Sequence, residues 1–367
     1  MRYFILTLGC QMNRSDAQRL AYLLNSLGLV PSSAKEADLI FVIACSVRQS
    51  AVDRIYGKLK DWQKKKVILT GCLLPFDQQK LKDKVSLIFP ISELHHLPQL
   101  LGQILPSLQF KDWLCAFDHY LQLPPLISGK EKEGYLPIMT GCNHFCTYCA
   151  VPYTRGQEVS RDKKEILAEA TFLLQKGIKR LILLGQNVNN YKEPGQKEGD
   201  FVALLKELVA LPFDFQLGFI SANPWNFPFE LIELIQKEPK LLKEIHLPLQ
   251  SGDDQVLRRM NRPYTASQYL TLVQKLRERI PQLYLSTDII VGFPGETEEQ
   301  FQNTVKVCQK AGFDKAYIAM YSPRPGTVAA RWSNDVPLKE KKRRWWILEK
   351  IINQPQLKKQ ARSLTSL

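Results

Sequence analysis

The sequence contains no apolar run that approaches the roughly 18 residues of a membrane-spanning helix. Near its N-terminus lies only the short run YFILTL. No small-residue cleavage site follows it, so we expect a buried strand there rather than a signal peptide. Internal repeats and low-complexity segments are also missing. These absences favour a cytoplasmic globular protein with no membrane contact, and 367 residues are enough for two or more domains.

Acidic side chains are too few to balance the basic ones. The chain has 50 Lys and Arg against 36 Asp and Glu, which gives a net charge of +14. A basic excess of this size favours a polyanionic partner, and nucleic acid is the first candidate. Half of the excess lies in residues 338–367, where nine basic residues meet two acidic ones.

This C-terminal segment is expected to form a basic amphipathic helix that breaks near Pro355. Trp345 and Trp346 lie among its Lys and Arg residues. One interpretation is contact with RNA through charge and stacking. The alternative, which the sequence supports equally well, is a solvated helix whose tryptophan pair packs on the rest of the protein.

Three of the eight cysteines directly follow expected strands. The expected strands are residues 3–8, 38–43 and 66–70, and helical patterns separate them at 13–28 and 47–62. Such a βαβαβ order predicts a parallel sheet whose strands end at one common edge. We therefore expect Cys10, Cys45 and Cys72 to meet there as metal ligands. The alternative is that they are three small buried residues in turns.

The segment GCNHFCTYC places Cys142, Cys146 and Cys149 close together, with no fourth cysteine nearby. Nothing marks secretion, so disulfides are a poor explanation. Thiolates are the usual ligands of iron–sulfur clusters, and electron-transfer clusters usually have four. Three ligands leave one iron open to another molecule. Zinc is a weak rival, because His144 lies between two of the ligands and could not easily bind with both.

The remaining cysteines, Cys115 and Cys308, lie in apolar and helical patterns and are expected to be ordinary buried thiols.

A βα pattern resumes after a linker rich in Pro, Gly and charge at residues 123–134. Six apolar runs follow, at 135–140, 180–185, 215–220, 244–249, 283–292 and 316–322. Six strands fall short of the eight of a full barrel. The expected fold class is α/β. It comprises an N-terminal βαβ parallel-sheet domain (1–122), a partial six-stranded (βα)6 barrel (135–335) and a basic C-terminal helical segment (336–367).

Three cysteines spaced three and then two residues apart, after the first strand of a partial βα barrel, are similar to the signature of radical S-adenosylmethionine (SAM) enzymes. The resemblance implies a [4Fe-4S] cluster whose open iron binds SAM through its amino and carboxylate groups. In that superfamily the reduced cluster splits SAM into methionine and a 5′-deoxyadenosyl radical. A radical suits a carbon–hydrogen bond that is too weakly acidic for a base, and the cofactor supplies this chemistry.

Further motifs resemble the methylthiotransferases within that superfamily. They are TLGCQMNRSD (7–16), ACSVR (44–48), TGCLLP (70–75), GCNHFCTYCAVPYTRG (141–156), LLGQNVNNY (183–191), HLPLQSGDDQVLRRMNRPYT (246–265), STDIIVGFPGET (286–297) and YSPRPGT (321–327). VPYTRG, GQNVN and YSPRPGT favour the branch that methylthiolates carbon 2 of isopentenyl-adenosine beside the anticodon of tRNA. Branches acting on threonylcarbamoyl-adenosine tRNA or on a ribosomal protein are the near alternatives. A non-catalytic, metal-containing RNA-binding protein is the alternative from another class.

The resemblance also implies ligands and partners. An auxiliary [4Fe-4S] cluster would be held by Cys10, Cys45 and Cys72, the trio that the strand-end argument reached independently. Further implied partners are tRNA and an external electron donor such as flavodoxin or ferredoxin, while the sulfur donor is not indicated. Contacts with SAM are carried over to Tyr148, Gln186, Asn187, Gln250, Ser251 and Asp288, each of which could instead pack in the core or cap a helix. No catalytic residue is assigned.

Arg155 and Arg324 could contact the SAM carboxylate or an RNA phosphate, and a surface ion pair is the alternative.

Two features depart from the family pattern. Ile43 and Ala44 stand where the family usually has Asn and Thr before its second N-terminal cysteine. We expect this difference to change hydrogen bonds to the auxiliary cluster without removing a ligand. The family also continues into a small C-terminal β-barrel RNA-binding domain (TRAM), which should begin where this chain stops at Leu367. We therefore expect that domain to be absent.

Overall fold

The computed structural model describes residues 1–46, 49–106, 117–196 and 199–357. The chain folds into two compact units, and each is built from several segments. One unit comprises 1–143, 149–184 and 324–326, and the other comprises 144–148, 185–323 and 327–367. Among the residues described, no helix combines the length and apolarity needed to cross a membrane. Cys115 and the basic residues 358–367 lie outside the described residues.

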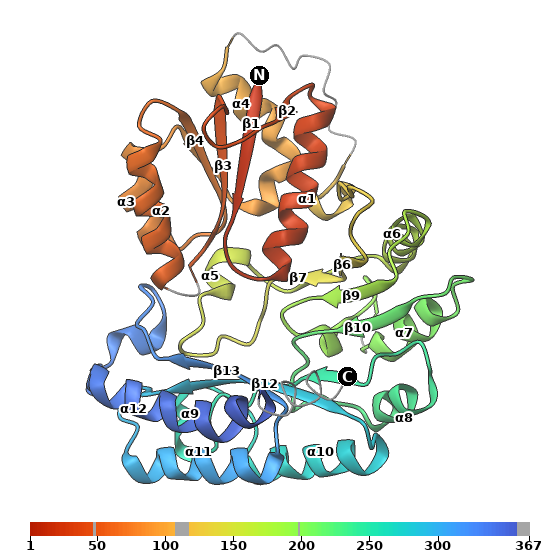
Figure 1. Cartoon of the computed structure of the whole chain (residues 1–367), viewed down its shortest axis with the longest axis vertical. Coiled ribbons are helices and arrows are strands. Elements are labelled where there is room, and N and C mark those ends of the chain that lie inside the picture. The colour runs from red at the N-terminus through yellow and green to blue at the C-terminus, as the bar shows by residue number, and fades with distance from the viewer. Residues whose placement is uncertain (47–48, 107–116, 197–198, 358–367) are drawn as a thin grey trace. The chain divides into compact units, whose positions relative to one another are not determined.

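A five-stranded parallel sheet forms the N-terminal part of the first unit (Figure 1). Its spatial order is β2 (Val30–Pro31), β1 (Arg2–Thr7), β3 (Leu39–Cys45), β4 (Lys66–Cys72) and β5 (Leu87–Ile88). The three strands expected from the sequence, β1, β3 and β4, are confirmed at its centre. All seven residues of β3 are buried, as expected for a parallel strand that is covered on both faces.

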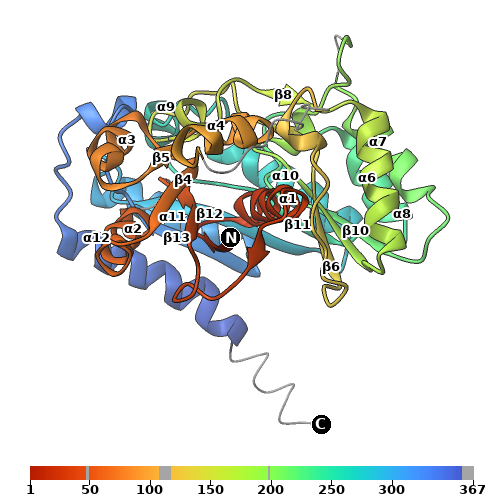
Figure 2. The same ribbon diagram turned by 90° about the horizontal axis from the view of Figure 1, so that it is seen from above.

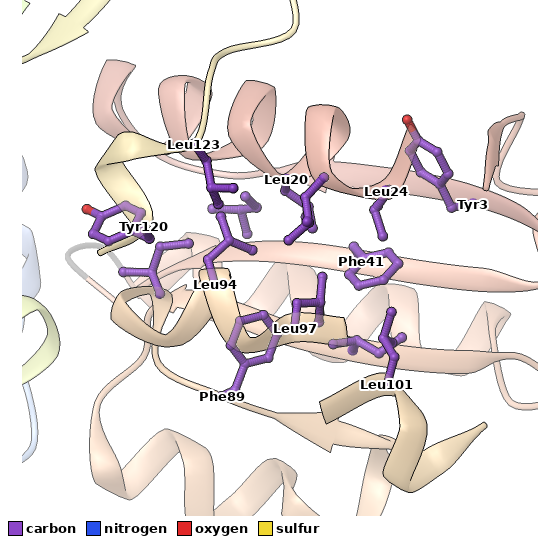
Figure 3. Close-up of a cluster of buried hydrophobic side chains, with 14 of the residues drawn as sticks. Tyr3, Leu20, Leu24, Phe41, Phe89, Leu94, Leu97, Leu101, Tyr120 and Leu123 are labelled. Carbon is purple, nitrogen blue, oxygen red and sulfur yellow. The ribbon is translucent and has the colours of Figure 1, made fainter. Parts of the chain in front are cut away.

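Helices cover both faces of this sheet (Figures 1 and 2). α1 (Gln11–Ser26) and α4 (Leu97–Ile104) pack on one face, while α2 (Gln49–Asp61) and α3 (Pro75–Leu81) pack on the other. Side chains alternate along a strand, so Phe41 of β3 enters the α1–α4 core and its neighbour Val42 enters the opposite core. Figure 3 shows Leu20 and Leu24 of α1 directed toward Phe41.

The same unit also contains the first two strands of the expected barrel. β6 (Glu133–Pro137) pairs in parallel with β9 (Arg180–Leu184), and α6 (Lys163–Gln175) connects them. A short antiparallel pair, β7 (Met139–Thr140) and β8 (Val159–Ser160), flanks α5 (Val151–Arg155). The segment predicted as a linker contacts α1, because the Leu126 N–H donates to the Gln18 carbonyl.

A buried ion-pair network joins α1 to α6 within this unit. Arg19 has no exposed side-chain surface, and its Nη2 lies 2.5 Å from Oε1 of Glu169. The other oxygen of Glu169 pairs with Nη1 of Arg161 at 2.8 Å. Arg19 also donates to the Leu121 and Leu123 carbonyls. Glu169 therefore pairs with both buried guanidinium groups, and Glu165 lies 3.6 Å from Nε of Arg161 as a second acid.

The second unit continues the barrel strands. They are β10 (Gln216–Phe219), β11 (Glu244–His246), β12 (Tyr284–Val291) and β13 (Lys315–Met320), and β11, β12 and β13 form a parallel sheet in that order. The helices between and around them are α7 (Phe201–Val209), α8 (Phe229–Lys237), α9 (Asp254–Arg259), α10 (Ala266–Arg279) and α11 (Glu298–Ala311). α10 and α11 contact each other, and both begin with a capping box, which satisfies their first free N–H groups. All six expected barrel runs therefore contain a strand.

The C-terminal helix differs from its prediction. α12 (Leu338–Leu348) is followed by a π-helical turn, Glu349–Asn353, and residues 354–357 remain helical. The helix is therefore not broken near Pro355. Proline lacks an N–H and its ring clashes with the preceding turn, and the wider π turn just before it accommodates both defects.

Two basic side chains of α12, Lys341 and Arg344, are buried. Lys341 is buried and its Nζ donates to the Tyr321 carbonyl, while Arg344 is buried against Glu296 at 2.8 Å. The indole N–H of Trp345 donates to the Ile318 carbonyl of β13. Trp346 is 51% exposed. Packing on the protein is thus the role of Trp345, and only Trp346 presents its ring to solvent.

Candidate cluster sites

Cys10, Cys45 and Cys72 lie at the carboxyl edge of the N-terminal sheet. Cys45 and Cys72 end β3 and β4 and are directly paired across the two strands. Cys10 is the N-cap of α1 and follows β1, the strand that pairs with β3. Cys10 is exposed, whereas the other two are buried. The three cysteines therefore follow neighbouring strands at one edge, while their role as metal ligands stays a prediction.

Gly9 allows this approach. Its φ is +103°, and a Cβ there would lie 2.8 Å from the Cβ of Cys45. Any other residue would therefore strain the backbone and push Cys45 away from Cys10.

Arg155 is the central polar residue of the N-terminal trio, although it follows the second trio in sequence. Its Nε lies 3.0 Å from Sγ of Cys72, and its Nη2 donates to Asn13 at 2.9 Å and to Asp16 at 2.6 Å. The Tyr120 hydroxyl lies 3.4 Å from its Nη1. The side chains of Arg155 and Asp16 are 1% and 0% exposed. This is neither a surface ion pair nor a residue left open for a SAM carboxylate.

Burial controls the protonation of this site. It raises the pKa of the Cys72 thiol to about 11, and the positive charge of Arg155 counteracts part of that rise. Burial likewise raises the pKa of Asp16, again opposed by Arg155. Without a bound cation the Cys72 thiol is therefore protonated at neutral pH, and binding of a metal would release its proton. Such a thiol is suited to ligation rather than to acting as a free nucleophile.

Arg324 is buried beside the same strand ends. Its Nη1 donates to Gln49 at 2.6 Å, and its Nη2 lies 3.3 Å from the carboxylate of Asp77. The Ser46 hydroxyl, directly after Cys45, also donates to Asp77 at 3.0 Å. Arg324 thus neutralises a buried acid and supports the loops that carry the N-terminal cysteines.

The second trio begins at a glycine that no other residue can replace without movement. Gly141 has a φ of +75°, and a Cβ there would lie 1.9 Å from the Gln157 carbonyl oxygen. The Cys142 N–H donates to the Gly156 carbonyl at 3.2 Å, and the Val151 N–H points to Sγ of Cys149 at 3.4 Å. Two of the three cysteines are thus fixed by backbone contacts.

Replacing Gly141 by alanine should distort this loop. The overlap with the Gln157 carbonyl adds to a backbone strain of about 1–3 kcal/mol, so we expect the loss of most iron at the second trio. Iron per protein should be measured in a variant that lacks Cys10, Cys45 and Cys72. Gly177→Ala is the control, because φ there is +90° but a Cβ meets no atom within 4 Å. Equal iron in both variants would contradict this account.

Cys146 is accompanied by an arginine and an aromatic stack in the second unit. Nη1 of Arg262 lies 3.6 Å from Sγ of Cys146, and its guanidinium lies 5.1 Å from the Trp225 ring. His144 stacks on Trp225 with the ring centres 4.4 Å apart. Asn261 donates to the His144 and Phe145 carbonyls. Arg262 lies in a motif that carries the resemblance but was not singled out from the sequence, and neither was Trp225.

His144 packs on Trp225 in the described structure. Among the residues described, no group of three or more His, Cys, Asp and Glu side chains is arranged to hold a single metal ion. Cys308, expected to be an ordinary thiol, is buried in α11 at 2% exposure.

The six residues carried over as SAM contacts all lie in the second unit but differ in setting. Tyr148 meets Phe293 edge-on with the ring centres 6.3 Å apart. Gln186 has a buried Oε1 without a hydrogen-bond partner among the described residues, and Asn187 is 7% exposed. Gln250 adopts a positive φ of 65° and its N–H donates to the Asp288 carbonyl at 2.8 Å. Among these six residues, Gln186 is the one with a buried side-chain oxygen that makes no hydrogen bond in the described protein.

Ser251 instead supports the fold. It is fully buried, its hydroxyl lies 3.3 Å from that of Thr304 and it accepts from the Asp253 N–H. Asp288 carries a different interaction, because its carboxylate lies 3.1 Å from Nε2 of His246. The other ring nitrogen of His246 lies 3.1 Å from the Ser286 hydroxyl. Sequence reasoning missed His246, although its place at the end of a barrel strand could have identified it.

Ser251→Ala should therefore lower stability without weakening SAM binding. It leaves the Asp253 N–H without its hydroxyl acceptor, at a cost of about 1–3 kcal/mol in the free energy of unfolding. Gln186→Ala should weaken SAM binding and leave stability unchanged, because its Oε1 makes no hydrogen bond in the described protein. Urea unfolding and equilibrium dialysis with SAM distinguish the two. Weaker SAM binding in Ser251→Ala alone would assign that residue to the ligand site.

Comparisons with known proteins bear on the class of fold. Residues 136–308 match the radical SAM superfamily, and residues 2–89 match an uncharacterized protein family, UPF0004. The radical SAM methyltransferase TsrM from Kitasatospora setae aligns with a TM-score of 0.63 and 13% identity, over 90% of this chain and 75% of that one. The cobalamin-dependent radical SAM enzyme OxsB aligns with a TM-score of 0.58 and 14% identity, over 96% and 58%. The expected fold class, a parallel-sheet domain followed by a partial radical SAM barrel, is confirmed.

Closer relatives identify the family. A tRNA-2-methylthio-N(6)-dimethylallyladenosine synthase of Caldicellulosiruptor saccharolyticus is 39% identical over 99% of this chain and 80% of its own length. Proteins of the same name from Alkaliphilus oremlandii and Thermotoga petrophila are 39% and 37% identical, and the chain covers 80% and 82% of them. The chain belongs to the family of the tRNA-2-methylthio-N(6)-dimethylallyladenosine synthases.

Proposed function

We propose that this protein is a radical SAM enzyme that adds a methylthio group to carbon 2 of the adenine in isopentenyl-adenosine of tRNA. The observation that carries the proposal is the presence of two complete cysteine trios, each with a buried or half-buried arginine at one thiol. The family uses SAM and [4Fe-4S] clusters, and two trios suit two clusters.

The residues fit these groups. Cys10, Cys45 and Cys72 would hold the auxiliary cluster, and Cys142, Cys146 and Cys149 would hold the SAM-binding one. Three thiolates per cluster leave one iron for another ligand. When bound, the clusters and SAM would supply the electron-transfer and radical chemistry that the side chains cannot provide.

The protein's own residues position and tune these groups. Gly9 and Gly141 let the ligand loops approach closely, and Arg155 and Arg262 place positive charge beside one thiol of each trio. Gln186 offers an unsatisfied buried oxygen for a polar part of SAM. The His246–Asp288 pair joins two neighbouring barrel strands, with Nε2 3.1 Å from the carboxylate. Tyr148, Asn187 and Gln250 are proposed as further SAM contacts.

We propose that the two cluster sites belong to different ranges of the chain. We assign residues 1–122 to the auxiliary site and 135–335 to the SAM site, with 123–134 between them and 336–367 as a basic helical end. The net charge of +14 supports attraction of tRNA. The proposal places the enzyme in the cytoplasm, with a flavodoxin or ferredoxin as electron donor, and leaves the sulfur donor unassigned.

The test is anaerobic. The protein is reconstituted with iron and sulfide, reduced, and given SAM with tRNA that carries isopentenyl-adenosine, after which digested nucleosides are analysed by mass spectrometry. A methylthio product establishes reaction and substrate together. Product on threonylcarbamoyl-adenosine tRNA or ribosomal protein instead would reassign the substrate. No SAM cleavage with both clusters bound would support a non-catalytic RNA-binding protein.

A further inference from the structure

We propose that Arg155 sets the reduction potential of the auxiliary cluster by donating a charged hydrogen bond to its ligand Cys72, and that Asp16 limits this effect. The inference rests on the proposed function, because it assumes that Cys10, Cys45 and Cys72 hold a cluster. It assigns Arg155 a tuning and positioning role that its sequence position, after the other trio, does not suggest.

The contacts of Arg155 are directional. Nε, the innermost nitrogen, points to Sγ of Cys72 at 3.0 Å, while Nη2 on the outer edge binds Asp16 and Asn13. The positive charge therefore lies nearer to the sulfur than the compensating carboxylate does. Asn13 in turn donates to the Leu8 and Ala44 carbonyls, which fixes it within the strand-end loops. Contacts with Asn13, Asp16 and Tyr120 therefore hold the guanidinium beside Cys72.

Burial strengthens the effect of the Arg155 charge on the cluster. The side chains of Arg155 and Asp16 are 1% and 0% exposed, so water screens neither of them. Hydrogen bonds to cluster sulfurs, net charge and solvent exposure are the protein's means of setting a cluster potential. A buried donor with a full positive charge stabilises the reduced, more negative form. Arg155 should raise the potential, and Asp16 should lower it.

Helix α5 brings Arg155 to this place. The Val151 N–H in its first turn points to Sγ of Cys149 at 3.4 Å, and Arg155 ends the same five-residue helix. One short helix thus contacts a thiol of each trio. Its backbone contacts Cys149 and its Arg155 side chain contacts Cys72. The position of Arg155 is consequently tied to the backbone that orients Cys149.

The potential is measured with one cluster at a time. A variant with Cys142, Cys146 and Cys149 replaced by alanine retains the N-terminal trio, and dithionite supplies the single electron that the cluster accepts during an EPR-monitored titration. In this background Arg155→Gln should lower the equilibrium constant for reduction at least tenfold, which is about 59 mV for a one-electron couple. Arg155→Lys should stay within threefold of the parent. Asp16→Asn should shift the constant in the opposite direction.

The complementary background, with Cys10, Cys45 and Cys72 replaced, provides the control. There Arg155→Gln should leave the potential unchanged, whereas Arg262→Gln, which removes the contact with Cys146, should lower it. The double variant Arg155→Gln/Asp16→Asn removes both buried charges and guards against misfolding caused by an uncompensated Asp16. Circular dichroism and iron content accompany each titration.

Three outcomes would overturn the proposal. One is a shift smaller than twofold in Arg155→Gln with iron retained. Another is an equal shift in both backgrounds. The third is that neither Arg155→Gln nor Arg155→Gln/Asp16→Asn binds iron, which would make Arg155 a purely structural residue. The titration uses no tRNA and is therefore independent of the product assay. If the potential shifts as expected but the assay with tRNA yields no methylthio product, only the proposed function is contradicted.

Discussion

Replacing Cys10, Cys45 and Cys72 together by alanine should abolish methylthiolation while SAM cleavage continues. The three thiols lie at one sheet edge, and the second trio lies elsewhere in the sequence with its own backbone contacts. Bound iron should fall from about eight to about four per protein. Iron analysis, 5′-deoxyadenosine formation and product mass spectrometry on the same samples measure the three effects.

The reciprocal variant is the control for this result. Replacing Cys142, Cys146 and Cys149 should also halve the iron, but it should abolish SAM cleavage and product alike. If loss of the N-terminal trio left product formation intact, the auxiliary role of that site would be wrong. If either triple variant lost all iron, the two trios would not be independent sites.

Glu169→Gln should cause the largest loss of stability, about 3–5 kcal/mol in the free energy of unfolding. Its carboxylate lies between two buried arginines, Arg19 and Arg161, and the amide would remove the charge that they share. Arg161 would keep only Glu165, 3.6 Å from its Nε and 27% exposed. A whole domain is stable by only about 5–15 kcal/mol. Much of the variant should therefore be unfolded or insoluble at 37 °C. The measurement is urea unfolding followed by circular dichroism.

The surface pair Lys206–Glu230 provides a matched comparison for this substitution. Its atoms are 2.6 Å apart, but the side chains are 55% and 61% exposed. Glu230→Gln makes the same chemical change at nearly the same distance, and exposed pairs contribute less than about 1 kcal/mol. Similar losses in the two variants would show that burial of the Arg19–Glu169–Arg161 network is energetically unimportant.

The sheet-edge site was predictable because it depends on rules that hold locally. Apolar runs and helical periods predict a parallel sheet, and a parallel sheet aligns the residues that follow its strands. Cys45 and Cys72 consequently end neighbouring strands as paired residues. The spacing of the second trio is equally local.

The charged partners were not predictable in this way. Arg155 lies 83 residues from Cys72, and Arg324 lies 247 residues from Asp77. No period or spacing relates such positions, so a SAM carboxylate or an RNA phosphate was as reasonable a partner. The rule that residues after strand ends bind ligands also predicts too many binding residues. Ser251 follows a strand, yet its hydroxyl forms a hydrogen bond with Thr304 in the core.

Arg324 has a consequence for how the enzyme is made on the ribosome. The N-terminal unit includes residues 324–326, so its last buried cation is synthesised 247 residues after Asp77. At about 5–20 residues per second, tens of seconds pass in which the nascent chain holds Asp77 without this partner. The loops after Cys45 and Cys72 gain their final support only after that delay. Cluster insertion at the sheet edge should therefore be completed after translation rather than during it.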